Sequence, residues 1–231
     1  MKPSFLLLAL LLSLPASAQT AAPVNADQGV VSFAFSWKEG IPWQSFAVRV
    51  QPDGKTHFEG TPSPSEEGDP DPVEQDFVMS EANRQRIFEA AQKLNYFQGD
   101  FDSHLKRIAQ TGSKTLTYQS SQVHGSSTYN YSQNPEVQQL TQLFLGLANT
   151  IDCGRRLAWS YRFDKLGLDQ RLRELEQLQA GHQAEELSAI EPILRKIADD
   201  PNLMHISRQS AAHLLKASSA SGNATQDPAQ P

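Results

Sequence analysis

The stretch 44–60, which reads QSFAVRVQPDGKTHFEG, constrains the fold of this chain more than any other. Apolar and polar residues alternate on both sides of a Pro-Asp-Gly tripeptide at 52–54, which is the pattern of a half-buried antiparallel hairpin. Proline presets the backbone for a turn, and glycine accepts the left-handed conformation that ends it. The alternation predicts that Val48 faces Phe58 and Val50 faces Thr56 on one buried face, with Arg49, His57 and Glu59 on the opposite, solvent face.

Further alternating stretches predict an α+β fold. Strands are expected at residues 30–37, 74–79, 106–110, 114–119 and 123–131, and the acidic, proline-rich segment 61–72 is expected to be an exposed loop. Ser80 can cap a helix that runs to about Asn95, and Asn134-Pro135 can start a second helix that ends at Gly154. For residues 30–154 we therefore expect an antiparallel sheet of about five to six strands with two helices packed on one face.

From residue 155 onward the pattern becomes wholly helical. Leu168, Leu172, Leu175 and Leu178 share one stripe that ends at Gly181, and further apolar stripes cover residues 189–197 and 207–217. Residues 155–217 are therefore predicted to form a C-terminal helical extension of three short helices. Residues 218–231 are small, polar and rich in proline at their end, which predicts a disordered tail.

The N-terminus has the pattern of a secretory signal. A lysine precedes an almost unbroken apolar run at 5–14, and Ala16-Ser17-Ala18 is a small-residue cleavage site. The apolar run stops at Pro15, short of the about 20 residues that a membrane-spanning helix needs. We expect residues 1–18 to be removed and residues 19–29 to form a disordered leader. The mature protein is then soluble, secreted or periplasmic, and without stable membrane insertion.

Composition narrows the classes of partner. The chain has 20 Lys and Arg against 26 Asp and Glu, and it has no dense basic patch, which argues against nucleic acid. Cys153 is the single cysteine, so no internal disulfide can form, and we expect its side chain to be buried in a core. The partner is expected to be an unknown protein or a small molecule.

An early alternating strand, the hairpin FAVRVQPDGKTHFEG, a capped helix ending in LNYF, two strands and a proline-started helix follow one another across residues 30–153. In this order and spacing the chain resembles an uncharacterised family of exported bacterial domains of unknown function. Many members of that family carry a pair of cysteines just before the hairpin, where this chain has Ile41-Pro42-Trp43. The resemblance implies the fold and the export, and it implies no activity.

Asp100, Asp102 and His104 are the candidate metal ligands. They alternate in the sequence DFDSH, so an extended backbone would point all three side chains to the same side. Two carboxylates and an imidazole could hold a divalent cation. The alternative is a solvated connection that Phe101 anchors inward. The acidic segment 66–76 could hold calcium, but it lacks the ligand spacing of a known calcium loop.

Large aromatic side chains form a third candidate, either as a surface for a partner or as a seal between the sheet and the C-terminal helices. They are Trp37, Trp43, Trp159, Tyr161 and Phe163.

The sequence contains no coherent catalytic set, so it predicts no catalytic residue and no cofactor. Three functions therefore stay open. The first is an exported, non-catalytic binding or interaction module of the cell envelope. The second is a metal-dependent hydrolase centred on Asp100, Asp102 and His104, which clustering of the histidines at 57, 104 and 124 around one cleft would favour. The third is a structural partner that docks through its C-terminal helices, which an exposed leucine stripe over 168–178 would favour.

Overall fold

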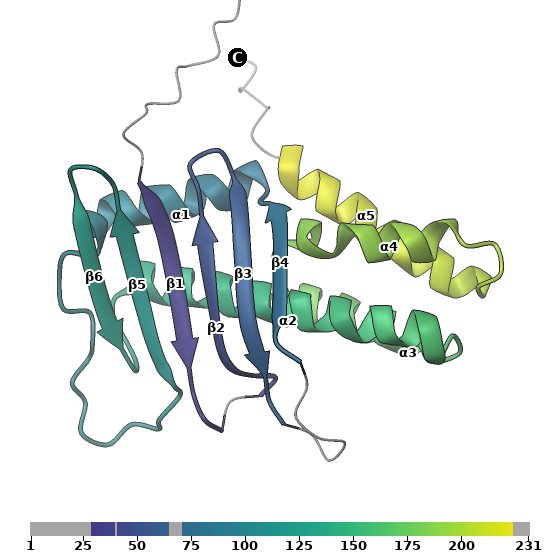
Figure 1. Cartoon of the computed structure of the whole chain (residues 1–231), viewed down its shortest axis with the longest axis horizontal. Helices are drawn as coiled ribbons and strands as arrows, with labels where there is room; N and C mark the ends of the chain where they lie inside the picture. Colours follow the sequence, from purple (N-terminus) through teal and green to yellow (C-terminus); the bar gives the residue numbers. More distant parts are fainter. Residues whose placement is uncertain (1–28, 40, 65–70, 224–231) are drawn as a thin grey trace, which may run out of the picture.

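The computed structural model describes residues 29–39, 41–64 and 71–223, and the predicted signal peptide, nearly all of the predicted leader and the end of the predicted tail lie outside these residues. The chain forms a six-stranded antiparallel sheet in the order β4-β3-β2-β1-β5-β6, with helices behind it and beside it (Figure 1). The predicted α+β fold class is confirmed. The strands are β1 (Val30–Ser36), β2 (Trp43–Val50), β3 (Lys55–Pro62), β4 (Val73–Val78), β5 (Ser113–Gln119) and β6 (His124–Tyr129).

The hairpin of β2 and β3 has the predicted register. Val48 faces Phe58 and Val50 faces Thr56, and all four side chains are buried. Gly54 closes the turn with a φ of 86°, a value at which a side chain would be strained. On the solvent face, Arg49 forms an ion pair with Glu59 at 3.3 Å. The alternation of the sequence therefore assigned both faces correctly.

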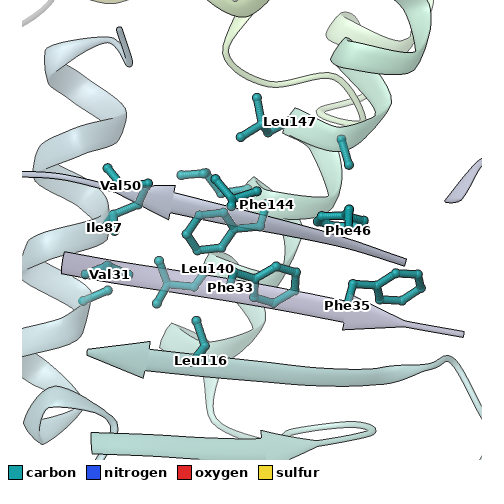
Figure 2. Packing of buried hydrophobic residues seen from close by; sticks show 14 of the residues in the cluster. Val31, Phe33, Phe35, Phe46, Val50, Ile87, Leu116, Leu140, Phe144 and Leu147 are labelled. Carbon is teal, nitrogen blue, oxygen red and sulfur yellow. The ribbon is translucent and has the colours of Figure 1, made fainter. Parts of the chain in front are cut away.

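Two helices cover one face of the sheet, as predicted (Figure 1). They are α1 (Glu81–Lys93), which is followed by the short helix η1 (Asn95–Phe97), and α2 (Pro135–Phe163). Ser80 caps α1 by accepting a hydrogen bond from the amide of Asn83, and Asn134 caps α2. The core between the sheet and these helices combines aliphatic and aromatic side chains: the rings of Phe33 on β1 and Phe144 on α2 stack with centroids 4.8 Å apart (Figure 2).

Helix α2 continues past Gly154, where the sequence predicted its end. Gly154 is buried, and a Cβ atom on it would lie 2.3 Å from Cγ2 of Ile190. The glycine is therefore needed for close packing in mid-helix and does not end the helix. The chain forms two hydrophobic clusters, and they divide within α2 between Ile151 and Leu157. The predicted boundary between sheet domain and extension thus falls inside one continuous helix.

The predicted strand at 106–110 is also wrong. These residues belong to an irregular connection that is tied to the end of β6 through hydrogen bonds that involve side chains. Asn130 donates its backbone N–H to Asp102 at 2.7 Å and its side-chain Nδ2 to Ala109 O at 3.1 Å. These hydrogen bonds hold the connection where a strand would have formed backbone hydrogen bonds to its neighbour. The expected loop at 61–72 begins two residues later than predicted because β3 extends to Pro62, and residues 65–70 lie outside the described residues.

The helical extension has its own hydrophobic cluster, to which the leucines at 168, 172 and 175 contribute fully buried side chains. The leucine stripe is therefore a core and not an exposed surface. The helix at the end continues to Asn223, beyond the predicted start of the tail at 218. The elements of this part are α3 (Leu168–Ala180), η2 (Leu187–Ile190), α4 (Glu191–Asp199) and α5 (His205–Asn223).

Candidate functional site

The loop around Asp100 brings the three predicted metal ligands together. The imidazole Nε2 of His104 lies 2.7 Å from Asp100 Oδ2, and its Nδ1 lies 3.8 Å from Asp102 Oδ1. Both carboxylates also accept backbone N–H groups: Asp100 accepts from Asp102 at 3.1 Å and Asp102 accepts from His104 at 2.7 Å. The polar groups therefore hold the turn itself, as in an ordinary Asx-type loop.

No group of three or more His, Cys, Asp or Glu within the described residues is arranged to hold a metal ion. Electrostatics in the loop are those of an ion pair. The hydrogen bond to Asp100 raises the pKa of His104, and the same bond is the main reason why the pKa of Asp100 is lowered. The metal site at Asp100, Asp102 and His104 stays a prediction, which a titration can decide.

We expect the Asp100→Asn substitution to lower the pKa of His104, as followed by NMR of its ring protons. This pair stabilises the fold fully between the ordinary pKa values of aspartate, about 3.9, and histidine, about 6.5. The stabilisation decreases as the pH rises through the raised pKa of His104 or falls through the lowered pKa of Asp100. A bound metal would act in the opposite direction, because it needs the neutral imidazole. Asp76→Asn, which removes the partner of His57, is the matched control and should leave His104 unchanged. If adding Zn²⁺ lowers the midpoint of His104, the ion-pair account is wrong.

The histidines at 57, 104 and 124 do not share a cleft. His57 pairs with Asp76 across β3 and β4 at 2.7 Å, whereas His124 begins β6 at the far edge of the sheet, four strands from β3. His104 lies in the connection that is tied to the opposite end of β6. The clustering of these three histidines around one cleft, which would have favoured a hydrolase, is therefore not seen.

A groove with a volume of about 500 Å³ lies where the end of β6, helix α2 and the loop after α3 meet. This volume is within the range of sites for small organic molecules, about 300–1,000 Å³. The wall on α2 is built from residues at helical spacing, and the loop after α3 contributes His182 and Gln183. The groove is lined by Thr111, Lys114, Tyr129, Asn130, Tyr131, Ser132, Gln138, Thr141, Gln142, Leu145, Gly146, Asn149, His182 and Gln183.

The groove contains a buried ammonium group. Lys114 lies on the core side of β5, and its Nζ donates to oxygens of Thr111, Gly112 and Asn130 at 2.9–3.0 Å. None of these partners is a carboxylate, and burial lowers the pKa of Lys114. The positive charge is held by neutral oxygens, so it is not cancelled locally. A ligand that carries acceptors or a negative charge is favoured here over a cation.

Tyr129 beside it does not provide acid–base chemistry. Its hydroxyl lies 2.6 Å from Oγ1 of Thr141, which in turn donates to the carbonyl of Val137. Burial raises the pKa of Tyr129 to about 12. Of the groove lining, His182 is the side chain of a type that commonly serves as a general acid or base, and the lining has no Asp, Glu or Cys. Amides and hydroxyls make up most of the other polar groups of the groove.

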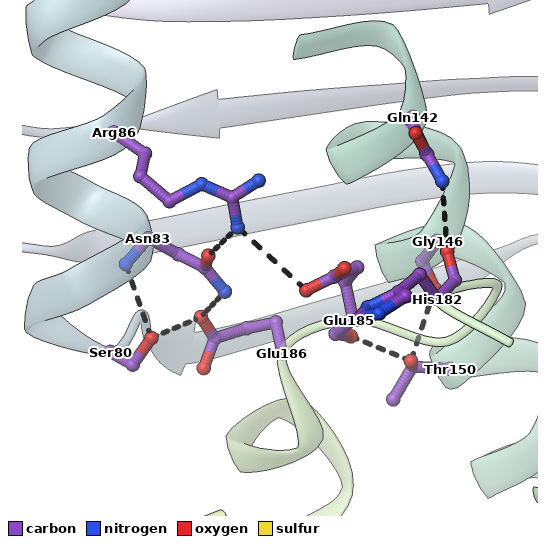
Figure 3. Close-up of polar contacts among 9 residues, drawn as sticks. All are labelled: Ser80, Asn83, Arg86, Gln142, Gly146, Thr150, His182, Glu185 and Glu186. Atoms are coloured by element: carbon purple, nitrogen blue, oxygen red, sulfur yellow. Dashed lines mark hydrogen bonds and ion pairs between the residues drawn. The ribbon is translucent and has the colours of Figure 1, made fainter. Parts of the chain in front are cut away.

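The loop after α3 closes one side of the groove by docking on α2 (Figure 3). Asn149 donates to the carbonyl of Gln183 at 2.9 Å, and Thr150 donates to the carbonyl of Glu185 at 2.6 Å. Gly146 lets the loop approach, because a Cβ atom there would lie 2.8 Å from Cγ of Glu185. The helical extension thus supplies one wall of the groove, through His182 and Gln183.

Glu186 fastens this loop to the start of α1. The residue is 6% exposed, and its carboxylate accepts hydrogen bonds from Ser80 Oγ at 2.7 Å and Asn83 Nδ2 at 2.9 Å (Figure 3). Ser188 donates to its second oxygen. The first turn of a helix also attracts negative charge, which suits a carboxylate at this place. Glu186 is therefore one of the contacts that link the two hydrophobic clusters.

No protein-family model matches the chain, and no curated protein matches it. The resemblance of residues 30–153 to exported domains of unknown function therefore stays a prediction. No helix in the described part of the chain is long and apolar enough to cross a membrane.

The remaining predicted residues lie in two different environments. Trp43 is buried and donates its indole N–H to the carbonyl of Ala148 at 3.0 Å, and Trp37 packs against the same core. Trp159 and Phe163 are exposed near the end of α2, so the five aromatics do not form one surface. Cys153 is half-buried against the second cluster, and burial raises the pKa of its thiol to about 11, which makes it a poor nucleophile.

Sequence reasoning missed the groove, although part of its signal is visible. Gln138, Gln142, Leu145 and Asn149 recur at helical spacing and make a mostly polar stripe on α2. The same helix carries the apolar stripe that packs on the sheet, and the sequence analysis uses the helix only for this packing. The opposite wall of the groove could not be predicted, because the contact of Gln183 with Asn149 depends on how the extension folds back.

Proposed function

We propose that this chain is an exported, non-catalytic binding protein of the cell envelope, and that the groove between β6, α2 and the loop after α3 takes a small polar ligand. The observation that carries the proposal is the lining of the groove: amides and hydroxyls surround a buried ammonium, and the lining includes no carboxylate or thiol. Export is supported by the secretory signal pattern at residues 1–18.

The chemistry of the ligand follows from these groups. Gln142 and Asn149 each use one N–H on the loop after α3, which leaves a second N–H and the amide oxygen for a ligand. Gln138 donates to Tyr131 and Ser132 and offers its amide oxygen, and Tyr131 adds a half-exposed ring and a hydroxyl. Such a set recognises a molecule with several hydroxyl or carbonyl groups and an apolar face. Lys114 adds a preference for neutral or acidic molecules over basic ones. A sugar or sugar acid of one or two rings fits this description and the volume.

The test is a set of thermal melts of the mature protein with neutral sugars, sugar acids and amino sugars. A ligand at about a hundred times its dissociation constant adds about 2.7 kcal/mol to the free energy of unfolding. We expect sugar acids to raise the melting temperature at least as much as neutral sugars, and amino sugars to raise it least. The Gln142→Ala variant should lose the shift.

Gln139→Ala is the matched control, since Gln139 is an exposed glutamine of the same helix outside the groove lining. It should keep the full shift. A shift that survives Gln142→Ala and is lost in Gln139→Ala would place the ligand elsewhere. No shift with any of the three sugar classes would contradict the proposed class of ligand.

A further inference from the structure

Large exposed apolar side chains gather at one end of the molecule. Of the nine that the described residues contain, five lie at or next to the α2–α3 and α4–α5 connections: Trp159, Phe163, Leu166, Met204 and Ile206. Figure 1 shows both connections at the end of the helical extension that is farthest from the sheet. The hydroxyl of Tyr161 on α2 donates to Asp200 at 2.9 Å, which holds the two connections side by side.

Three of these side chains form a stripe on α2 and the turn that follows it. Trp159, Phe163 and Leu166 are 57%, 69% and 79% exposed, and the rings of Trp159 and Phe163 lie 5.7 Å apart. Their spacing of four and three residues is that of one helix face. The five side chains together are called the apolar end below. Exposed aromatic and aliphatic groups in such a cluster indicate a docking surface.

Basic side chains lie beside the apolar end. Residues 155–166 carry four Arg and Lys against one acidic residue, Asp164, but Arg155 and Arg156 both pair with Asp152, and Asp199 and Asp200 lie where α4 ends. Arg162 and Lys165 are therefore the cations that matter for docking. Arg162 lies over the ring of Phe163 at 5.8 Å and has no carboxylate partner within the described residues. Lys165 forms a long ion pair with Asp200 at 3.9 Å, and its side chain stays about half exposed.

We propose that the apolar end docks on an anionic lipid surface, with Trp159, Phe163 and Leu166 entering the headgroup region and Arg162 and Lys165 facing the lipid phosphates. Tryptophan, phenylalanine and leucine beside arginine and lysine are the composition of helices that lie at a membrane interface. The surface is the outer end of a helical hairpin and not a groove, which suits insertion between headgroups. A symmetric contact with a second copy would instead bring two copies of the same basic side chains into one interface. This docking is peripheral and needs no spanning helix.

The test uses the mature protein with vesicles of phosphatidylcholine alone and of phosphatidylcholine mixed with phosphatidylglycerol. Trp159 is the reporter, because Trp43 is buried and Trp37 is half-buried. We expect flotation with the mixed vesicles, a blue shift of the tryptophan emission and quenching by brominated lipid. Phe163→Ser with Leu166→Ser should weaken the binding by about tenfold or more, and Arg162→Glu with Lys165→Glu should abolish the preference for the anionic vesicles.

Ile41→Ser with Val78→Ser is the matched control, since both side chains are exposed and apolar but lie outside the apolar end. It should bind as the unchanged protein does. Absence of flotation with either vesicle, or equal loss in the control, would overturn the proposal. A blue shift that grows with protein concentration in the absence of lipid, together with faster sedimentation, would overturn it in favour of a second copy of the chain.

Discussion

Replacing Phe58 by alanine is expected to lower the free energy of unfolding by about 3–5 kcal/mol. The ring is fully buried and contacts two other aromatic rings, Trp43 at 5.1 Å and Phe46 at 5.7 Å between centroids. Truncation removes the transfer free energy of the ring and leaves a cavity among stiff neighbours that cannot collapse freely. Denaturant melts should show a lower midpoint with an unchanged slope.

His57→Ala is the matched control, because His57 precedes Phe58 on the same strand and faces the other way. Its partner Asp76 is largely exposed, so the lost contact should change the free energy of unfolding by less than about 1 kcal/mol. Equal losses in the two variants would show that the faces of the hairpin are assigned wrongly.

Glu186→Ala is expected to lower the free energy of unfolding by about 2–4 kcal/mol, although the residue is charged. The substitution leaves the buried donor of Asn83 and the half-buried donor of Ser80 without their acceptor, and it loosens the loop that joins the two hydrophobic clusters. Because Glu186 has a φ of 58°, Glu186→Gly relieves the backbone and should be less destabilising than Glu186→Ala by about 1 kcal/mol. Calorimetry or denaturant melts of both variants measure these differences.

Glu185→Ala provides the control for Glu186. The neighbouring carboxylate lies 3.9 Å from Arg86, and only the backbone carbonyl of Glu185 accepts the bond from Thr150. We expect this variant to lose less than about 1 kcal/mol. A larger loss in Glu185→Ala than in Glu186→Ala would contradict the role given to Glu186 as a link between the clusters.

The sequence was sufficient for elements whose pattern is local. Alternation gave both faces of the β2–β3 hairpin, and the side chains of Ser80 and Asn134 marked the starts of α1 and α2. Gly154 was misread because a glycine that allows close packing in mid-helix looks, in sequence, like a glycine that ends a helix. The difference lies with Ile190, which approaches it from a distant part of the chain.

The groove could not be predicted from local sequence patterns either, because its walls come from distant parts of the chain. Alternation along β5 places Lys114 on the same face as Leu116 and Tyr118, but the oxygens of Gly112 and Asn130 that hold its buried ammonium are seen only in the fold. The link of Glu186 to Ser80 joins residues more than a hundred positions apart. The loop at Asp100 was predicted as a candidate site because its polar residues lie within five positions of one another, so their proximity is visible in the sequence.

The measurement that tests the central claim most directly is an NMR titration of the mature protein, labelled with ¹⁵N, with the sugar or sugar acid that gives the largest thermal shift. The side-chain amide signals of Gln138, Gln142 and Asn149 report on the groove, and those of Gln139 report on the same helix outside it. We expect the first three to move together with the backbone signals of His182 and Gln183, while Gln139 stays in place. Shifts confined to the loop at Asp100, or signals that do not move at a saturating concentration, would contradict the assignment of the groove as the binding site.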